Sequence, residues 1–531
     1  MTITENKKYK VLIPTAGTGS RLGNLTKYIN KSLISVQNKP VISKIIEMFP
    51  LNTEFVIALG YKGNLVKQFL TLAYPDRIFY FVTVDKYEGE GSGLGHTILA
   101  CEQYLKEPFV FCSCDTIVKE KIPFPKRNTI GICNRKNKTQ YRTADIIRNK
   151  VSKLLDKGKH TENSKPYIGL ACIKDFELFW QLMKNGKEEA NRIGESYALS
   201  EFAKMGILFS KEFTWFDTGN IEELEKAQEY YNKKNTKNIL PKENEAIWFF
   251  DDLVIKFFDN SNFVKNRMER TKYLKQFVPQ IISHTNNMYC YKEEKGNVLS
   301  TIEDIEVFCK LLDFSKKMWK IKKLTKIENE NFITICKEFY QRKTINRLKK
   351  YYEKFNIEDK KNIINGEEIP TLKSILNKVD WNNICNGIAG NFHGDFHFEN
   401  ILYNEENNKF IFLDWRQSFG EIIQYGDIYY DLAKLLHGLI ICHELIAKNK
   451  YKIEISPDTI NYSFKRKKIL IECEKYFYQW LKDNNYDVKK VKILTALIYL
   501  NIAALHHEPY CHLLYNLGKK MLFDNVCINE I

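Results

Sequence analysis

Short apolar runs alternate with helix-like segments through the first third of the chain, and this alternation constrains the fold more than any other feature. The runs are short and bounded, as buried strands are. They are KVLIP at 10–14, FVIALG at 55–60, FYFVTV at 79–84 and FVFCSCD at 109–115. The segments between them, at 40–49 and 92–105, have helical patterns. Alternation at this spacing predicts a parallel α/β sheet, with ligands beyond the carboxyl ends of its strands.

A chain of 531 residues exceeds what one hydrophobic core usually serves, so two or three domains are expected. The residue composition changes at 232–245, where the sequence NKKNTKNILPKENE is polar, rich in lysine and contains a proline. We place the junction there, which predicts domains at 1–235 and 246–531. The second domain opens with strand-like pieces at 251–258 and 287–294 and continues with long helical patterns. A small sheet followed by a mostly helical body is therefore expected.

The composition argues against several classes of protein. Hydrophobic residues make up 44% of the chain, which is too many for a disordered protein. The net charge of +16 comes from scattered lysines, so we interpret it as a solvated surface, with attraction of small anionic substrates as the alternative and no nucleic acid as partner. The 13 cysteines form no CxxC pair, which favours reduced thiols. Without a recognisable signal or membrane-spanning run, the sequence predicts a cytoplasmic protein with no membrane insertion.

A glycine-rich loop follows the first strand run, in the sequence VLIPTAGTGSRLG at 11–23. Gly17 and Gly19 would let backbone N–H groups approach a phosphate, and the guanidinium of Arg21 could bind its oxygens in pairs. A simple turn is an equally good interpretation of the loop alone, whose spacing fits neither a dinucleotide fingerprint nor a P-loop. The phosphate interpretation is strengthened by three polar residues that occur later in the chain. They are Lys31, the strand-end acid Asp115, and Asp217 in WFDTGN.

Over about residues 8–232, this combination of loop, lysine, strand-end aspartate and WFDTG resembles the sugar-phosphate nucleotidyltransferases, or nucleoside-diphosphate-sugar pyrophosphorylases. The resemblance implies a Rossmann-like α/β sheet domain that transfers a nucleotidyl group from an NTP to a sugar phosphate. It implies these roles: Mg²⁺ ligation by Asp115 and Asp217, stabilisation of the triphosphate and the departing pyrophosphate by Arg21 and Lys31, binding of the sugar phosphate by Lys157, and binding of sugar hydroxyls by Glu195.

Two of these roles have simple alternatives, since Lys157 could be a surface lysine and Glu195 a helix-capping acid. The chain also departs from the pattern of these enzymes. Asn30 stands where a proline usually precedes the lysine, and His96 stands where glutamine or alanine is common in the base-reading loop. These departures leave the nucleotide base open more than the reaction.

A second polar cluster lies far downstream, in NFHGDFHFENILY at 391–403 and FLDWRQSFG at 412–420. Transfer of phosphate from ATP to a hydroxyl needs an acid that accepts the proton, an amide oxygen that holds a metal, and a second acid that carries metal to the phosphates. Asp395, Asn400 and Asp414 supply these groups in that order. An ordinary polar turn is the alternative.

Over about residues 246–525, these stretches resemble the aminoglycoside phosphotransferase and choline kinase superfamily, which implies a protein-kinase-like α+β domain. By that resemblance Asp395 is the catalytic base, and Asn400 and Asp414 hold Mg²⁺. The resemblance also assigns two nucleotide-binding residues: Lys256, which would bind the ATP phosphates, and its partner Glu269.

Several further polar residues are assigned structural roles. We expect His393 to brace the loop, and Asp427 and Asp431 to cap a helix and hold the loop. His506 and His507 lack a third ligand at a recognisable spacing, so no metal site is predicted there.

A kinase and a nucleotidyltransferase in one chain suggest consecutive steps. Our leading hypothesis is an enzyme that phosphorylates a sugar at its anomeric hydroxyl with ATP, and then converts the sugar 1-phosphate and an NTP into an NDP-sugar for a surface polysaccharide. The alternative substrate is choline or another amino alcohol, which would give a CDP-activated head group. A third hypothesis makes one domain a silent binding module. The sugar, the nucleotide base and the oligomeric state are open at this point.

Overall fold

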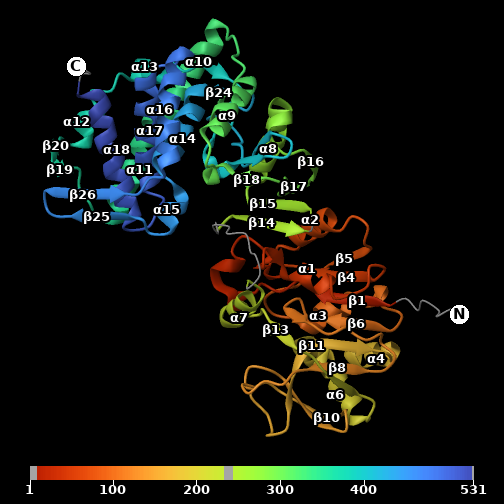
Figure 1. The fold of residues 1–531 in the computed structure, drawn as a ribbon. Helices are drawn as coiled ribbons and strands as arrows, with labels where there is room; N and C mark the ends of the chain where they lie inside the picture. The colour runs from red at the N-terminus through yellow and green to blue at the C-terminus, as the bar shows by residue number, and fades with distance from the viewer. Residues whose placement is uncertain (1–8, 233–242, 251, 529–531) are drawn as a thin grey trace. The chain divides into compact units, whose positions relative to one another are not determined.

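The computed structural model describes residues 9–232, 243–250 and 252–528. The chain divides into two compact units (Figure 1). Unit 1 comprises residues 1–261 and 281–293, and unit 2 comprises residues 262–280 and 294–531. Within the described residues, no helix has both the length and the apolar character that a membrane span requires.

A nine-stranded sheet forms the centre of unit 1. In spatial order its strands are β5 (Phe79–Thr83), β4 (Glu54–Leu59), β1 (Lys10–Pro14), β6 (Phe109–Cys112), β11 (Lys165–Ile173), β8 (Thr129–Ile132), β12 (Phe209–Glu212), β10 (Lys150–Leu155) and β9 (Thr143–Ile147). The first four are mutually parallel, as the sequence predicted. Strand β11 runs antiparallel to both β6 and β8, so the sheet as a whole is mixed.

Helices cover both faces of this sheet, because the apolar side chains of the central strands alternate between the faces. On β1, Val11 and Ile13 belong to one hydrophobic cluster and Leu12 to the other. The first cluster is completed by α1 (Val41–Ile46), α2 (Gly63–Ala73) and α7 (Ile221–Asn232). The second is completed by α3 (Leu94–Leu99), α4 (Phe176–Asn185), α5 (Lys187–Ile193) and α6 (Ser196–Lys204).

Two smaller pairings extend this α/β body. The short strands β2 (Ser35–Val36) and β3 (Lys39–Pro40) form a hairpin after the glycine-rich loop. Strand β7 (Thr116–Val118) pairs antiparallel with β13 (Trp215–Asp217), with Asp217 opposite Thr116. The second pairing brings the WFDTGN stretch next to the end of β6.

A second, four-stranded sheet belongs to unit 1 as well. Its spatial order is β14 (Glu245–Phe250), β15 (Leu253–Phe258), β17 (Met288–Lys292) and β16 (Ile281–His284). Trp248 packs edge-on against Phe69 of α2 with ring centroids 5.0 Å apart, and the backbone N–H of Asn287 donates to Oε1 of Gln68 at 2.9 Å. Residues of this sheet and of β1 therefore share one hydrophobic cluster. The junction predicted at 232–245 separates sequence segments that share a core.

Unit 2 is mostly helical. Its helices are α8 (Ser261–Leu274), which begins at the division, α9 (Ile305–Met318), α10 (Lys326–Lys337), α11 (Lys343–Phe355), α12 (Leu372–Leu376), α13 (Trp381–Cys385), α14 (Ile428–Ile440), α15 (His443–Ala447), α16 (Lys468–Asp483), α17 (Val488–Ala503) and α18 (Tyr510–Val526). Helix α14 is almost wholly buried, and the hydroxyl groups of Thr495 and Tyr499 on α17 donate to its carbonyls.

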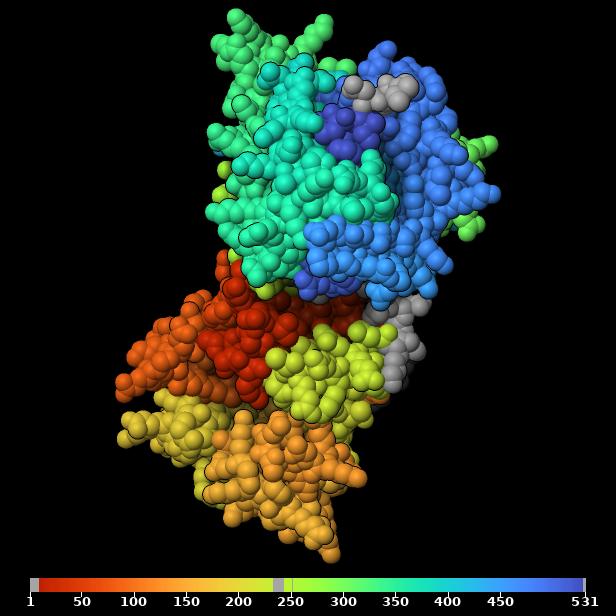
Figure 2. Space-filling view, turned by 90° about the vertical axis from the view of Figure 1, so that its left-hand side faces the viewer, coloured from red at the N-terminus to blue at the C-terminus, as the bar shows by residue number. Residues whose placement is uncertain are grey.

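Small sheets complete unit 2. They are β18 (Asn297–Val298) with β22 (Ile401–Asn404) and β23 (Lys409–Phe412); β20 (Glu367–Ile369) with β19 (Asn362–Ile364), β26 (Thr459–Phe464) and β25 (Tyr451–Ile455); and β21 (Ala389–Gly390) with β24 (Gly426–Asp427). Figure 2 shows the segments around 360–370 and 451–464 side by side on one face, as the parallel pairing of β19 with β26 requires. The sequence had indicated only helices in these two regions.

Candidate functional site

The loop after β1 is held by hydrogen bonds at its start and by a glycine in its middle. Both the backbone N–H and the hydroxyl of Thr15 donate to the carbonyl of Ala58, at 2.9 and 2.8 Å. Gly19 has a φ of +70°, and a Cβ there would lie 2.9 Å from Thr26 and 3.0 Å from Lys31, so only glycine fits. A Cβ at Gly17 would meet no heavy atom of the described residues within 4 Å, which leaves open space beside the loop.

Asn30, which replaces the usual proline, ties this loop together. Its buried side-chain amide donates to the carbonyls of Thr15 at 2.9 Å and Tyr61 at 2.7 Å. Its side-chain oxygen accepts from the backbone N–H and the hydroxyl of Ser32, at 2.9 and 2.8 Å, and so caps the 3₁₀ turn that begins at Lys31. The departure from the pattern therefore has a structural role.

We expect Asn30→Ala to lower the stability of unit 1 by about 2–4 kcal/mol, because the carbonyls of Thr15 and Tyr61 lose their donor and the 3₁₀ turn loses its cap. Thermal unfolding followed by circular dichroism measures the effect. Asn24→Ala, at an exposed position in the same loop, is the matched control. Equal melting temperatures for the two variants would contradict the assigned role.

Lys31 and Asp115 form an ion pair at the carboxyl end of β6. Nζ of Lys31 lies 2.9 Å from Oδ2 of Asp115, and the hydroxyl of Ser113 donates to Oδ1 at 2.6 Å. Burial opposes the charge of Asp115, but the charge of Lys31 and these hydrogen bonds outweigh it and lower the pKa of Asp115 to about 2. The same pairing raises the pKa of Lys31 despite its burial. Both groups are therefore charged at neutral pH.

Arg21, Asp115 and Asp217 converge at Gly219. A Cβ on Gly219 would lie 3.0 Å from Oδ1 of Asp217, 3.1 Å from Oδ2 of Asp115 and 3.2 Å from Nη2 of Arg21. Asp217 is held by the backbone N–H of Gly219 at 2.8 Å and by the hydroxyl of Tyr141 at 3.0 Å. Burial, followed by the charge of Asp115, raises the pKa of Asp217. The glycine of WFDTG thus leaves room for the charged groups that the sequence had predicted to act together.

The two carboxylates fit a magnesium ion that also binds a triphosphate. Mg²⁺ usually takes one or two protein carboxylates and completes its octahedron with phosphate oxygens and water. Asp115 and Asp217 are close enough to disfavour each other's charge, and a divalent cation would relieve that repulsion. No group of three or more His, Cys, Asp or Glu side chains suited to a metal occurs among the described residues.

Lys157 and Glu195, the two predicted sugar-phosphate contacts, have different surroundings. Lys157 is exposed in the loop after β10, and its pKa is lowered by desolvation and then by the charges of Arg21 and Arg142, which places it near the convergence. Glu195 immediately precedes α6 but makes no capping hydrogen bond through its side chain, so the helix-capping alternative is not supported. Oε1 accepts from the hydroxyl of Tyr167 at 3.1 Å, and buried Oε2 has no partner among the described residues.

The buried carboxyl of Glu195 should make the stability of the folded protein depend on pH. Burial raises its pKa to about 7, so folded protein holds a proton that unfolded protein releases above about pH 4.5. The stability of the wild type should therefore fall as pH rises from 4.5 through 7, whereas Glu195→Gln stays neutral. We expect equal stability below about pH 4 and a variant about 3 kcal/mol more stable at pH 8. Denaturant unfolding at both pH values measures this, with exposed Glu188→Gln as control; a variant less stable at pH 8 would contradict it.

The predicted base-reading loop packs closely on α5. A Cβ at Gly95 would lie 1.9 Å from the carbonyl oxygen of Ala190, so this glycine is required by packing. His96, the unusual residue of the stretch, places Nε2 2.7 Å from Oδ1 of Asp85.

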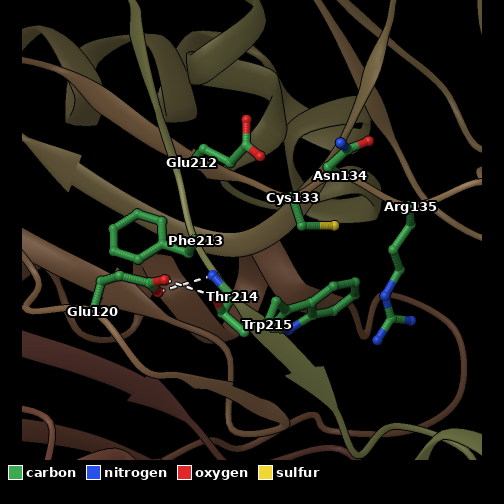
Figure 3. A pocket seen from close by; sticks show the side chains of 8 residues that line it. All are labelled: Glu120, Cys133, Asn134, Arg135, Glu212, Phe213, Thr214 and Trp215. Carbon is green, nitrogen blue, oxygen red and sulfur yellow. Dashed lines mark hydrogen bonds between the residues drawn. The ribbon is translucent and has the colours of Figure 1, made fainter.

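A pocket of about 310 Å³ adjoins β13 (Figure 3). Its lining residues are Glu120, Cys133, Asn134, Arg135, Glu212, Phe213, Thr214 and Trp215. The guanidinium of Arg135 lies 4.6 Å from the Trp215 ring centroid, and Trp215 contacts the ring of Tyr141, whose hydroxyl binds Asp217. Trp215 in the pocket wall therefore packs on Tyr141, which in turn holds the carboxylate of Asp217.

In unit 2, a side chain of α14 holds the loop at 391–400 by hydrogen bonds to its backbone. Asp431 accepts from the backbone N–H groups of His393 and Gly394, both at 2.6 Å, and from the indole of Trp319 at 2.9 Å. Burial nevertheless raises the pKa of Asp431 to about 6. Asp427 caps α14 by accepting from the backbone N–H of Tyr429. The structural roles predicted for these two acids are confirmed.

Asp395 lies at the centre of the loop and is contacted from two sides. Nζ of Lys434 on α14 lies 2.8 Å from Oδ1. The side-chain amide of Asn400 donates to Oδ2 at 3.2 Å, and Nε2 of His397 lies 3.5 Å from the same oxygen. These charges lower the pKa of Asp395 although burial opposes ionisation, so it is a carboxylate. The predicted base and the predicted amide ligand are therefore adjacent.

Asp414 follows β23 in a left-handed backbone conformation, with φ +58°. The backbone N–H of the preceding residue, Leu413, donates to the carbonyl of Asn400 at 2.7 Å, so Asp414 follows β23 beside the loop at 391–400. Nη1 of Arg267 lies 3.6 Å from Oδ1 of Asp414. Asn400 and Asp414 supply the oxygen ligands that Mg²⁺ prefers, so this donor set also fits.

The two predicted ATP contacts lie in different units. Lys256 is buried on β15 of unit 1, where it pairs across the sheet with Tyr289. Glu269 is on α8 of unit 2, and Oε2 of Glu269 lies 2.5 Å from Nζ of Lys272. Their predicted pairing with each other stays a prediction.

Several residues that contact the site residues were not predicted from the sequence. Tyr141 and Ser113 bind the carboxylates of unit 1, and Arg267 and Lys434 those of unit 2. Lys434 could have been noticed in the sequence, because it is the only lysine in the apolar helical stretch IYYDLAKLLHGLI and lies three residues after Asp431.

An α/β sheet that gathers an arginine, a lysine and two aspartates beyond its strands is the arrangement expected of a nucleotidyltransferase. The N-terminal region of the chain is indeed related in sequence to such proteins. The protein GlmU of Methanococcus maripaludis strain C5, described as bifunctional, is 22% identical over 252 residues, which cover 46% of this chain and 60% of GlmU. The UTP–glucose-1-phosphate uridylyltransferase AglF of Haloferax volcanii is 27% identical over 110 residues, 20% of this chain and 44% of AglF.

The chain thus spans about 60% or less of these relatives' lengths. Among solved structures, a Bacillus anthracis protein described as a glucose-1-phosphate thymidylyltransferase is 21% identical, with a TM-score of 0.37 and coverage of 44% of this chain and 98% of that one. No family model matches the chain.

Proposed function

We propose that unit 1 transfers a nucleotidyl group from an NTP to a sugar phosphate. The observation that carries the proposal is the convergence of Arg21, Asp115 and Asp217 at Gly219, with Lys31 on Asp115. In the reaction a phosphate oxygen of the sugar phosphate forms a bond to the α-phosphorus. The bond from that phosphorus to the bridging oxygen breaks, and pyrophosphate leaves with the electron pair.

The residues of unit 1 bring anions together and neutralise their charge. Arg21 and Lys31 would bind the triphosphate and then the departing pyrophosphate, while Gly17 and Gly19 let it lie close to the backbone. Mg²⁺, when held by the two aspartates, would supply charge neutralisation at the α-phosphate. Lys157 would bind the sugar phosphate, and the unpartnered Oε2 of Glu195 would accept a hydrogen bond from a sugar hydroxyl.

For unit 2 we propose a kinase that uses ATP and Mg²⁺. The adjacency of Asp395, Asn400 and Asp414 supports it. The hydroxyl oxygen of the acceptor would attack the γ-phosphorus, its proton would pass to Asp395, and ADP would leave with the electrons of the broken bond. Because a kinase makes what a nucleotidyltransferase consumes, the two steps are proposed to be consecutive and to yield an NDP-sugar for a surface polysaccharide.

Pyrophosphate release from the full chain tests this function. Each of CTP, UTP, GTP and dTTP is combined with Mg²⁺ and with glucose, mannose, N-acetylglucosamine or heptose 1-phosphate, or with phosphocholine. Release with a sugar phosphate identifies the base and supports the proposal. Release only with CTP and phosphocholine would replace it by the amino-alcohol alternative, and no release with any pair would count against nucleotidyl transfer to these acceptors.

A further inference from the structure

Three basic side chains lie close to one another and to Asp395. Lys434 contacts Oδ1 of Asp395, whereas Asn400 contacts Oδ2. Arg416 lies against the loop, since its backbone N–H donates to the carbonyl of His393 at 2.8 Å and a Cβ at Gly394 would lie 2.5 Å from Arg416 Cβ. The third member of this basic cluster is Lys343, at the start of α11.

The ring of Phe339 brings two of these cations together. Nζ of Lys343 lies 4.2 Å from its centroid, and Cζ of Arg416 lies 4.9 Å from it. Tyr430, one turn before Lys434 on α14, packs edge-on against the same ring with centroids 4.9 Å apart. Lys343, Arg416 and Lys434 therefore extend from three elements toward one region beside Asp395.

The cluster lacks matching negative charge. Among the described residues, no carboxylate lies within 4.0 Å of a side-chain nitrogen of Lys343 or Arg416, and the buried Nε of Arg416 has no acceptor. Burial, followed by the charges of Arg416, Lys434 and Arg347, lowers the pKa of Lys343 to about 7. Three cations beside one carboxylate, Asp395, leave an excess of positive charge, and such a site is suited to an anion.

We propose that the phosphoryl acceptor of unit 2 is an anionic alcohol, whose carboxylate or phosphate group binds Lys343 and Arg416 while its hydroxyl faces Asp395. The inference rests on the proposed kinase function and narrows its acceptor. The hydroxyl oxygen forms the new bond to the γ-phosphorus, ADP takes the electrons of the broken bond, and Asp395 takes the proton. The oxyanion of the acceptor is left unchanged.

This assignment separates the acceptor from ATP and from choline. Asn400, a predicted metal ligand that would approach the ATP phosphates, contacts Oδ2 of Asp395, whereas Lys434 contacts Oδ1. A quaternary ammonium group would meet like charges, and the Phe339 ring, which could have held it, already carries Lys343 and Arg416.

A panel of acceptors tests the proposal with the full chain, Mg²⁺ and γ-labelled ATP. It contains glucuronate and glycerate as carboxylates, glycerol 3-phosphate and fructose 6-phosphate as phosphates, glucose and N-acetylglucosamine as neutral alcohols, and choline as a cation. We expect labelled product from a carboxylate or a phosphate acceptor, and the active group identifies the oxyanion. Preferred use of choline or of a neutral sugar would overturn the proposal.

Variants identify the responsible side chains. Lys343→Gln and Arg416→Gln should each lower kcat/KM for the anionic acceptor about 10- to 100-fold, because each removes a charge-assisted hydrogen bond. Acceptor-free ATP hydrolysis and the KM for ATP should stay within about twofold. Lys350→Gln, on the exposed side of the same helix, is the matched control. Unchanged kcat/KM in both cluster variants would contradict the proposal.

A binding measurement tests the proposed anion site even if no member of the panel is phosphorylated. Brief treatment of the full chain with acetic anhydride at pH 7.5 should acetylate Lys343, which mass spectrometry detects. Inorganic phosphate or glucuronate should protect Lys343 at least about threefold, whereas glucose and choline should not; absence of protection by either anion overturns the proposal. If the chain showed no ATP turnover that depends on Asp395 but the anions still protected Lys343, the proposed kinase function would be withdrawn. An anion-binding site at Lys343 would remain.

Discussion

Asp115→Asn is expected to lower pyrophosphate release by about 10³-fold, the scale found when one preorganised electrostatic contact is removed from an active site. The substitution removes a carboxylate from the convergence at Gly219 and leaves Lys31 without its ion-pair partner at 2.9 Å. Steady-state release of pyrophosphate with the NTP and sugar phosphate found for the wild type measures the loss. Phosphoryl transfer by the same protein should be unchanged.

Two further variants guard against misfolding as the cause of that loss. Asp76→Asn changes an exposed aspartate of unit 1 and should keep full activity. Asp217→Asn removes the second carboxylate but spares the Lys31–Asp115 ion pair, and a comparable loss is expected. Activity retained in both folded Asp115 and Asp217 variants would refute the assignment of the two carboxylates.

Asp395→Asn is expected to lower phosphoryl transfer by about 10²–10⁴-fold, the contribution of a positioned general base. The amide cannot accept the acceptor's proton, and the contact of Lys434 with a charged oxygen is lost. Label transfer from ATP measures the effect, and pyrophosphate release from a preformed sugar phosphate should stay at the wild-type rate. Asp458→Asn, at an exposed position of unit 2, is the control. Loss of both activities in a folded variant would contradict independent sites.

The sequence predicted the elements of the fold that have a strong local signal. The strand runs at 10–14 and 109–115 contain β1 and β6, because buried parallel strands are continuous apolar runs. The hairpin of β25 and β26 was missed, because its residues alternate weakly and half of them are exposed. The capping and loop-holding acids Asp427 and Asp431 could be assigned from their place in YGDIYYD.

The site contacts that were missed depend on long-range packing. Tyr141 contacts Asp217 across 76 positions of the chain, and Lys434 contacts Asp395 from the next helix. No local spacing encodes such pairs. The glycine-rich loop was open to two interpretations from sequence, and it is the surroundings of Gly219 that bring its arginine to two aspartates.

The hydrophobic cluster shared by α2 and the sheet of β14–β17 limits how such a chain can be rearranged in evolution or in the laboratory. Exchange of the two halves as cassettes at the polar linker would leave Trp248 and Phe257 facing water in one product and Phe69 in the other. Each fragment would expose an apolar face that favours aggregation. A working chimera would have to carry residues 245–258 and 281–293 together with the first half, so an exchange at the polar stretch of 232–245 would not keep this core intact.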